Sequence, residues 1–172
     1  MDGLIHVYTG SGKGKTTAAI GLSVRCFGTG KKVVFAQFIK TSKTGELAVF
    51  ETLGIPVIRS ALNLGWTFQM GEDAKRQCRA EQHKLLSQIQ DALKDGPDLL
   101  VLDEVLDAVS VGMLDDSDLK KLLENKPAKT EIAITGRPVP GWLKEMSSYF
   151  SIIEKVKHPF DKGIAARTGI EK

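Results

Sequence analysis

The chain has 172 residues, of which 42% are hydrophobic and 26% charged, and its formal net charge is +3. These values are typical of a globular protein, and we expect one domain spanning residues 1–172. The weak net charge gives no indication of a nucleic-acid partner, and we expect none. No apolar stretch approaches the roughly 20 residues of a membrane span, so we expect no membrane binding. We also expect no N-terminal leader peptide.

Apolar runs alternate with helical patterns along the chain, which predicts an α/β fold with a mostly parallel central sheet of about six strands and helices on both faces. The expected strands are residues 4–8, 32–39, 56–59, 99–104, 131–135 and 150–156. The first helix follows a loop at residues 9–17 and ends near Gly28, and the later helices are expected at residues 46–53, 72–94, 105–111, 117–124 and 142–146.

The two cysteines, Cys26 and Cys78, have no metal-binding spacing. We expect both to lie in helices as small apolar residues. This pattern fits a reducing cytoplasm, which is the expected location of the protein.

A glycine-rich loop joins the first expected strand to the first helix. Its sequence is Thr9-Gly10-Ser11-Gly12-Lys13-Gly14-Lys15-Thr16-Thr17. Alternating glycines permit a tight turn whose N–H groups cradle phosphate oxygens, while Lys15 would face the phosphates and the Thr16 hydroxyl would ligate Mg²⁺. The loop departs from the G-x-x-x-x-G-K-[ST] pattern at Thr9, and a chance glycine-rich turn is the alternative. Residues 10–17 are therefore predicted to bind a nucleotide in a three-layer fold like that of P-loop NTPases.

Two acidic residues, Asp103 and Glu104, end the apolar strand expected at residues 99–104. The carboxyl ends of parallel strands form the ligand edge of such sheets, so both residues are predicted to lie at the Mg²⁺. Glu104 is a candidate metal ligand or general base, and the alternative is that one of the two acids caps the next helix.

Arg137 follows the strand expected at residues 131–135 and should lie on the same edge of the sheet. It either reaches the nucleotide or a negatively charged co-substrate, or it pairs with a carbonyl at a helix end.

Two aromatic residues, Trp66 and Phe68, stand in a segment without strand or helix periodicity. With Gly65 they suggest a lid or platform against a large, flat, apolar ligand. The alternative is that one of the rings fills the core beneath the loop.

From Tyr8 to Glu171 the sequence resembles the P-loop type of ATP:corrinoid adenosyltransferase. The resemblance rests on the glycine-rich loop and on these further motifs: Gln37-Phe38-Ile39-Lys40, Gly45-Glu46, Gly65-Trp66-Thr67-Phe68, Val101-Leu102-Asp103-Glu104, Ile134-Thr135-Gly136-Arg137, Val156-Lys157-His158-Pro159-Phe160, Gly163-Ile164 and Gly169-Ile170-Glu171. The aromatic loop and the Lys-His-Pro-Phe segment are the more specific of these.

This resemblance implies that the 5′-deoxyadenosyl group of ATP is transferred to the Co(I) of a corrinoid, with Mg²⁺ as cofactor and triphosphate as product. It implies a nucleotide bound in the reverse sense, with C5′ toward the corrinoid, and a catalytic role for Lys15. It also implies that Gly65, Trp66 and Phe68 bind the corrinoid, where the two aromatic residues promote reduction of Co(II) by displacing its lower ligand. The resemblance further implies that a reduced flavoprotein donates the electrons and that the protein forms a homodimer.

Two other functions remain open from the sequence. One is an ordinary P-loop NTPase or small-molecule kinase, with Glu104 as the base. The other is a non-catalytic module that binds a nucleotide or a corrinoid.

Overall fold

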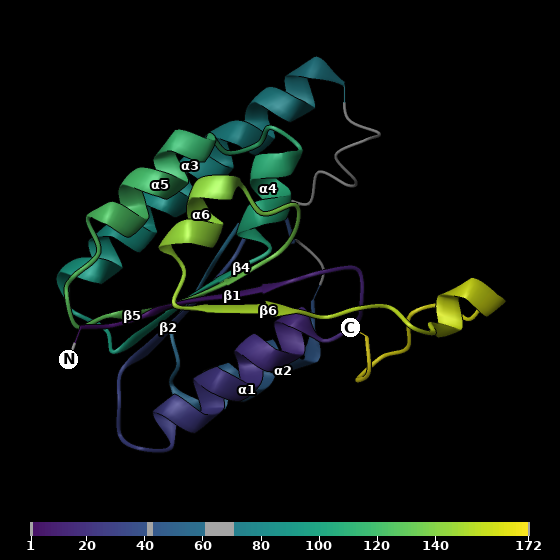
Figure 1. Cartoon of the computed structure of the whole chain (residues 1–172), viewed down its shortest axis with the longest axis horizontal. Coiled ribbons are helices and arrows are strands. Elements are labelled where there is room, and N and C mark those ends of the chain that lie inside the picture. The colour runs from purple at the N-terminus through teal and green to yellow at the C-terminus, as the bar shows by residue number, and fades with distance from the viewer. Residues whose placement is uncertain (1, 41–42, 61–70, 172) are drawn as a thin grey trace.

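The computed structural model describes residues 2–40, 43–60 and 71–171 (Figure 1). Within them, six strands form one sheet in the order β3-β2-β4-β5-β1-β6, and every neighbouring pair is parallel. The strands are β1 (Ile5–Thr9), β2 (Val33–Gln37), β3 (Val57–Arg59), β4 (Leu99–Asp103), β5 (Glu131–Thr135) and β6 (Tyr149–Ile152). The predicted parallel α/β architecture is confirmed.

Helices cover both faces of this sheet, as predicted (Figure 1). On one face lie α3 (Glu72–Lys94), α4 (Val105–Ser110), α5 (Asp116–Glu124) and α6 (Gly141–Met146), and on the other α1 (Lys15–Phe27) and α2 (Gly45–Leu53). A short 3₁₀ helix, η2 (Pro159–Lys162), lies in the C-terminal segment. The chain therefore forms three layers.

Successive side chains of a strand point to opposite faces of the sheet, so each buried strand contributes to the hydrophobic core on both faces. In β4, Leu100 and Leu102 pack with the α3 side, whereas Leu99 and Val101 pack with α1 and α2. All five residues of β4 are buried, which explains the uninterrupted apolar run in the sequence.

Three strands end earlier than predicted, for local reasons. Strand β2 ends at Gln37 because Ile39 takes a left-handed backbone conformation (φ 45°). Strand β4 likewise ends at Asp103, before Glu104 (φ 60°). Strand β6 ends at Ile152 rather than at residue 156, because its one neighbour, β1, ends at Thr9 and turns into the glycine-rich loop.

Both cysteines lie in helices as free thiols, Cys26 in α1 and Cys78 in α3. Among the described residues, none of the helices combines the length and apolar character needed to cross a membrane.

Candidate nucleotide and metal site

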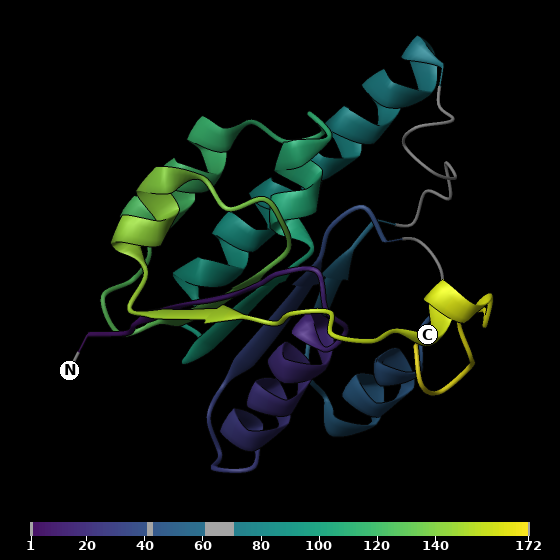
Figure 2. The same ribbon diagram turned by 45° about the vertical axis from the view of Figure 1, so that its right-hand side comes forward.

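A cavity of about 460 Å³ opens at the carboxyl edge of the sheet, beside the start of α1. It is lined by the loop from Gly12 to Thr17, by Lys40, Glu46 and Glu104, and by the C-terminal segment Gly169–Glu171. Figure 2 shows this C-terminal segment folding back toward the start of α1. Residues from both ends of the sequence therefore meet where parallel sheets bind ligands.

The glycine-rich loop packs closely against the chain that leaves β6. A Cβ atom on Gly10 would lie 2.3 Å from the Ile153 carbonyl oxygen, and one on Gly12 would lie 2.7 Å from that of Glu154. The Gly12 N–H donates a 2.7 Å hydrogen bond to the Ile153 carbonyl, so this N–H is already engaged. Gly14 instead serves the turn itself, because its φ of 122° suits glycine alone.

Lys15, the first residue of α1, turns its side chain back over the loop. Its Nζ donates to the carbonyl oxygens of Gly10 (2.9 Å) and Gly12 (3.0 Å). Burial and then the charge of Arg137 lower the pKa of Lys15, while Asp107 and the acids at the end of β4 oppose this shift. The ammonium group thus lies at the loop, as the pattern predicts.

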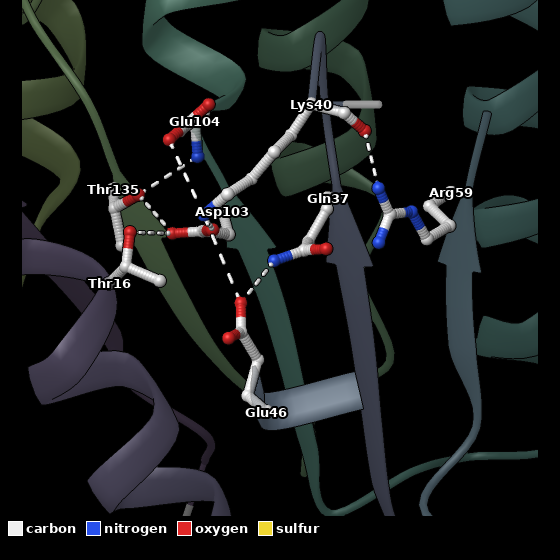
Figure 3. A network of polar contacts seen from close by, with 8 residues as sticks. All are labelled: Thr16, Gln37, Lys40, Glu46, Arg59, Asp103, Glu104 and Thr135. Atoms are coloured by element: carbon white, nitrogen blue, oxygen red, sulfur yellow. Dashed lines mark hydrogen bonds and ion pairs between the residues drawn. The ribbon is translucent and has the colours of Figure 1, made fainter. Parts of the chain in front are cut away.

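Asp103 is the buried centre of a polar network (Figure 3). Its Oδ1 accepts 2.8 Å hydrogen bonds from the hydroxyls of Thr16 and Thr135. Its Oδ2 is buried and has no hydrogen-bond partner in the described part of the chain. Burial raises the pKa of Asp103 above its ordinary value, against the Lys40 charge, the two hydroxyls and the nearby Gln37 side chain.

Glu104 lies next to this network and borders the cavity. Its backbone N–H donates to the Thr135 hydroxyl (2.8 Å), which anchors the left-handed turn after β4. Burial, followed by the charge of Asp103, raises the pKa of Glu104 to about 7. Glu104 is the N-cap residue of α4, but its side chain makes no capping hydrogen bond, so the capping alternative does not hold for it.

Lys40 brings a cation among the acids from the end of β2 (Figure 3). Its Nζ lies 3.9 Å from Glu46, 3.9 Å from Asp103 and 3.8 Å from Glu104. Glu46 also accepts a 3.0 Å hydrogen bond from the buried Gln37 amide. Burial would raise the pKa of Glu46, but hydrogen bonding and the Lys40 charge hold it below its ordinary value.

Arg137 lies at the same edge of the sheet, as expected, with an exposed side chain. Its positive charge acts to lower the pKa of Lys15 and that of Asp107, a half-buried residue of α4. Burial raises the pKa of Asp107, and hydrogen bonding from the Arg137 backbone opposes the shift.

The predicted corrinoid residues Gly65, Trp66 and Phe68 lie outside the described residues. Of the other predicted residues, the cavity lining brings together Gly12, Lys13, Gly14, Lys15, Thr16, Thr17 and Glu104. Ser11 is exposed, and its hydroxyl accepts a hydrogen bond from the Lys155 N–H (3.3 Å).

Sequence reasoning assigned no role to Lys40, Glu46 and Thr135, although all three occur in motifs that carry the family resemblance. The motifs therefore marked these three residues, but nothing in the local sequence indicates that they lie next to Asp103 in the fold.

The residues around Asp103 suit a hard divalent cation. The side chains of Thr16, Asp103 and Glu104 offer oxygen ligands, which Mg²⁺ prefers, and one Asp103 oxygen is buried without a hydrogen bond. Among the described residues, a group of His83, Asp115 and Asp118 also has ligand atoms close together, but none of the three lines this cavity.

The parallel sheet and the glycine-rich loop at its carboxyl edge are consistent with a P-loop NTPase-like fold. Residues 1–171 match the family described as ATP:corrinoid adenosyltransferase BtuR/CobO/CobP. The chain belongs to this family.

Curated relatives agree with this assignment. The chain is 35% identical to the corrinoid adenosyltransferase of Escherichia coli K12 over 170 residues, which cover 98% of this chain and 85% of the relative. Identity and coverage are the same for the Salmonella typhimurium LT2 corrinoid adenosyltransferase CobA. The Pseudomonas aeruginosa corrinoid adenosyltransferase is 33% identical over 173 residues, covering 98% of this chain and 83% of the relative.

Proposed function

We propose that this chain transfers the 5′-deoxyadenosyl group of ATP to the Co(I) of a corrinoid and releases triphosphate. The observation that carries the proposal is the cavity where Lys15 and Thr16 of the loop meet Glu104, with Thr16 hydrogen-bonded to the buried Asp103, in a chain of this family. We further propose that residues 1–172 act as one domain.

The reaction needs an electron pair from cobalt and a leaving group. The Co(I) pair forms the bond to C5′, the C5′–O bond breaks, and its electrons leave with the triphosphate. No water attacks and no proton must move, so the protein's main task is to stabilise the growing negative charge on the triphosphate. Lys15 and the N-terminal end of α1 are suited to this task, and Arg137 lies close enough to contribute.

Before ATP binds, Lys15 is held by carbonyl oxygens of its own loop. Phosphate oxygens are stronger partners because they are charged, so we expect the ammonium to exchange the carbonyls for phosphates. The exchange needs only a short side-chain movement, since Lys15 already lines the cavity.

Thr16, Asp103 and Glu104 are proposed to hold Mg²⁺ at the triphosphate. When bound, the ion would neutralise phosphate charge. Thr135 is proposed to position Asp103, because its hydroxyl binds the same carboxylate oxygen as Thr16.

The corrinoid side of the proposal rests on resemblance. Gly65, Trp66 and Phe68 are proposed to bind the corrinoid and displace its lower ligand, and a reduced flavoprotein is proposed to supply the electrons.

A homodimer is also proposed. The edge strand β6 exposes the large apolar side chains of Tyr149 and Ile152, which is unusual for an unprotected edge. A cytoplasmic location is proposed, in keeping with free cysteines and an ATP substrate.

One observation favours a second candidate, an NTPase or small-molecule kinase. Glu104 borders the cavity with a pKa raised to about 7, which is the range expected of a general base. In that case orthophosphate or a phosphorylated product would form without any corrinoid.

A spectroscopic assay separates these functions. Purified protein is mixed with ATP, Mg²⁺ and chemically reduced cobalamin under anaerobic conditions. Formation of a light-sensitive alkylcobalamin spectrum is expected. Orthophosphate released without corrinoid would support the NTPase instead, and binding without any reaction would support a non-catalytic module.

A further inference from the structure

We propose that the Lys40 ammonium group holds the place of the divalent cation in the nucleotide-free protein, and that the ion replaces it when the metal–nucleotide complex binds. This inference rests on the proposed magnesium site. It adds a residue that controls when the site accepts its ion.

The Lys40 ammonium lies among three carboxylates. Its Nζ is 3.8–3.9 Å from oxygens of Glu46, Asp103 and Glu104, which come from α2, the end of β4 and the turn after it. These separations are too long for direct hydrogen bonds, so the ammonium is shared among three carboxylates (Figure 3). A charge centred among several oxygen anions is the environment of a bound metal ion.

One oxygen of this cluster has no hydrogen bond in the part of the chain that the structure describes. Asp103 is fully buried and its Oδ2 has no hydrogen-bond partner among the described residues, while Lys40 Nζ is the cation beside it. Buried carboxylate oxygens are rarely left without a partner. Asp103 accepts a hydrogen bond from Thr16, which lines the cavity, so the unpartnered oxygen beside this contact indicates a missing ligand. Lys40 supplies the charge that the oxygen needs but not a close contact.

The backbone holds Lys40 in this position. Ile39, directly before it, has a φ of 45°, and its N–H donates to the buried Gln82 side chain of α3 (3.1 Å). The Lys40 carbonyl accepts a 3.0 Å hydrogen bond from Arg59. Ile39 and Glu104 are the non-glycine residues with positive φ in the described part of the chain, and they flank this network. Strained backbone retained on both sides is consistent with a functional arrangement.

Competition between two cations follows from this geometry. A divalent ion near Asp103 would meet the repulsion of an ammonium only a few ångströms away, so free metal should bind weakly. The nucleotide phosphates add ligands and anions to the same cavity, which Lys40 also lines, and can accept the displaced ammonium. The site would therefore fill with the metal–nucleotide complex rather than with free metal.

The test is a titration of Mn²⁺ by electron paramagnetic resonance, at pH 8, on full-length protein stripped of metal and nucleotide. Lys40→Met and Lys40→Gln should each tighten Mn²⁺ binding at least about tenfold over wild type. Lys40→Arg, which keeps the charge, should bind as weakly as wild type. Lys84→Met is the matched control, because it removes the same charge from the exposed surface of α3 and should change nothing.

A second measurement uses the wild-type protein, in case the neutral variants fold poorly. Reductive methylation of Lys40, followed by peptide mass spectrometry, should increase at least about twofold when Mn²⁺ saturates the site, while methylation of Lys84 stays constant. If the neutral variants bind Mn²⁺ with unchanged affinity, or if Lys40 methylation is unchanged at Mn²⁺ saturation, the proposed role of Lys40 is overturned. The proposed magnesium site would stand after either result. No Mn²⁺ binding by any variant would overturn the magnesium site as well, whereas adenosyl transfer is tested separately.

Discussion

The Thr16 hydroxyl donates a 2.8 Å hydrogen bond to Asp103, which lies 87 residues later in the chain. The bond joins the first turn of α1 to the end of β4, although β5 lies between β4 and β1 in the sheet. Thr135, at the end of β5, completes the bridge by donating to the same oxygen. The loop lysine and the acids of the proposed magnesium site are therefore held relative to each other by side-chain hydrogen bonds.

This bridge can be tested by removing one hydroxyl. Thr16→Val should lower adenosylcobalamin formation about 10- to 100-fold, because it removes a proposed metal ligand and loosens Asp103. Thr16→Ser keeps the hydroxyl and should retain most of the activity. The loss of one hydrogen bond should cost only about 1 kcal/mol of unfolding free energy, measured in urea, so unfolding would not explain the effect. Equal activity in both variants would argue against Thr16 as a ligand.

The close approach of the loop to the chain after β6 predicts a contrast between two glycines. Gly12→Ala should lower the unfolding free energy by about 1–3 kcal/mol, because its Cβ would lie 2.7 Å from the Glu154 carbonyl oxygen. Gly21→Ala, within α1, meets nothing within 4 Å and should raise it by about 0.5–1 kcal/mol. Thermal and urea unfolding measure both, and similar effects in the two variants would contradict the packing described.

Glu104 predicts a pH dependence of stability in the absence of metal and nucleotide. Its pKa rises from 4.5 to about 7 on folding, so between these values the folded state binds more protons than the unfolded state. The stability from this group is fully present below pH 4.5 and is lost as the pH rises through about 7. Because 34% of the side chain is exposed, we expect a change of only about 1 kcal/mol.

Urea unfolding between pH 5 and 8 (about the range in which Glu104 ionises) is the measurement. Glu104→Gln cannot ionise at this position and should show a shallower fall in stability than wild type. Parallel curves for the two proteins would mean that Glu104 titrates normally.

The aromatic loop predicts a difference between two cobalt substrates. Trp66→Ala and Phe68→Ala should slow the reaction that starts from Co(II) and a reduced flavoprotein at least about tenfold more than the reaction supplied with Co(I). The reason is that a four-coordinate cobalt accepts an electron more easily, and only the first reaction needs that step. Equal losses in both reactions would contradict displacement of the lower ligand.

The fold could be predicted largely from the sequence because its signals are local. The apolar run of β4 and the stripe of Cys78, Leu85, Ile89 and Leu93 on α3 each specify their own element and buried face. The ends of β2 at Gln37 and of β4 at Asp103 could not be predicted, since the positive φ of Ile39 and Glu104 leaves no pattern in the sequence.

The position of the candidate site could be predicted where one motif contains its residues, as with Lys15 and Thr16, which both line the cavity. It was not predictable where the chemistry depends on separate segments. Lys40 has no acidic residue within five positions along the chain, and its contacts with Asp103 and Glu104 exist only because β2 and β4 are adjacent in the sheet. The engaged N–H of Gly12 likewise depends on the path of the chain after β6.

The group that leaves when C5′ is attacked distinguishes adenosyl transfer from the other reactions of ATP. Phosphorus NMR of a reaction with ATP, Mg²⁺ and excess Co(I) cobalamin measures this directly, with Lys15→Ala as the inactive control. We predict intact triphosphate in equal amount to the adenosylcobalamin formed, and neither product from the variant. Orthophosphate or diphosphate in place of triphosphate, or full activity of Lys15→Ala, would contradict the account.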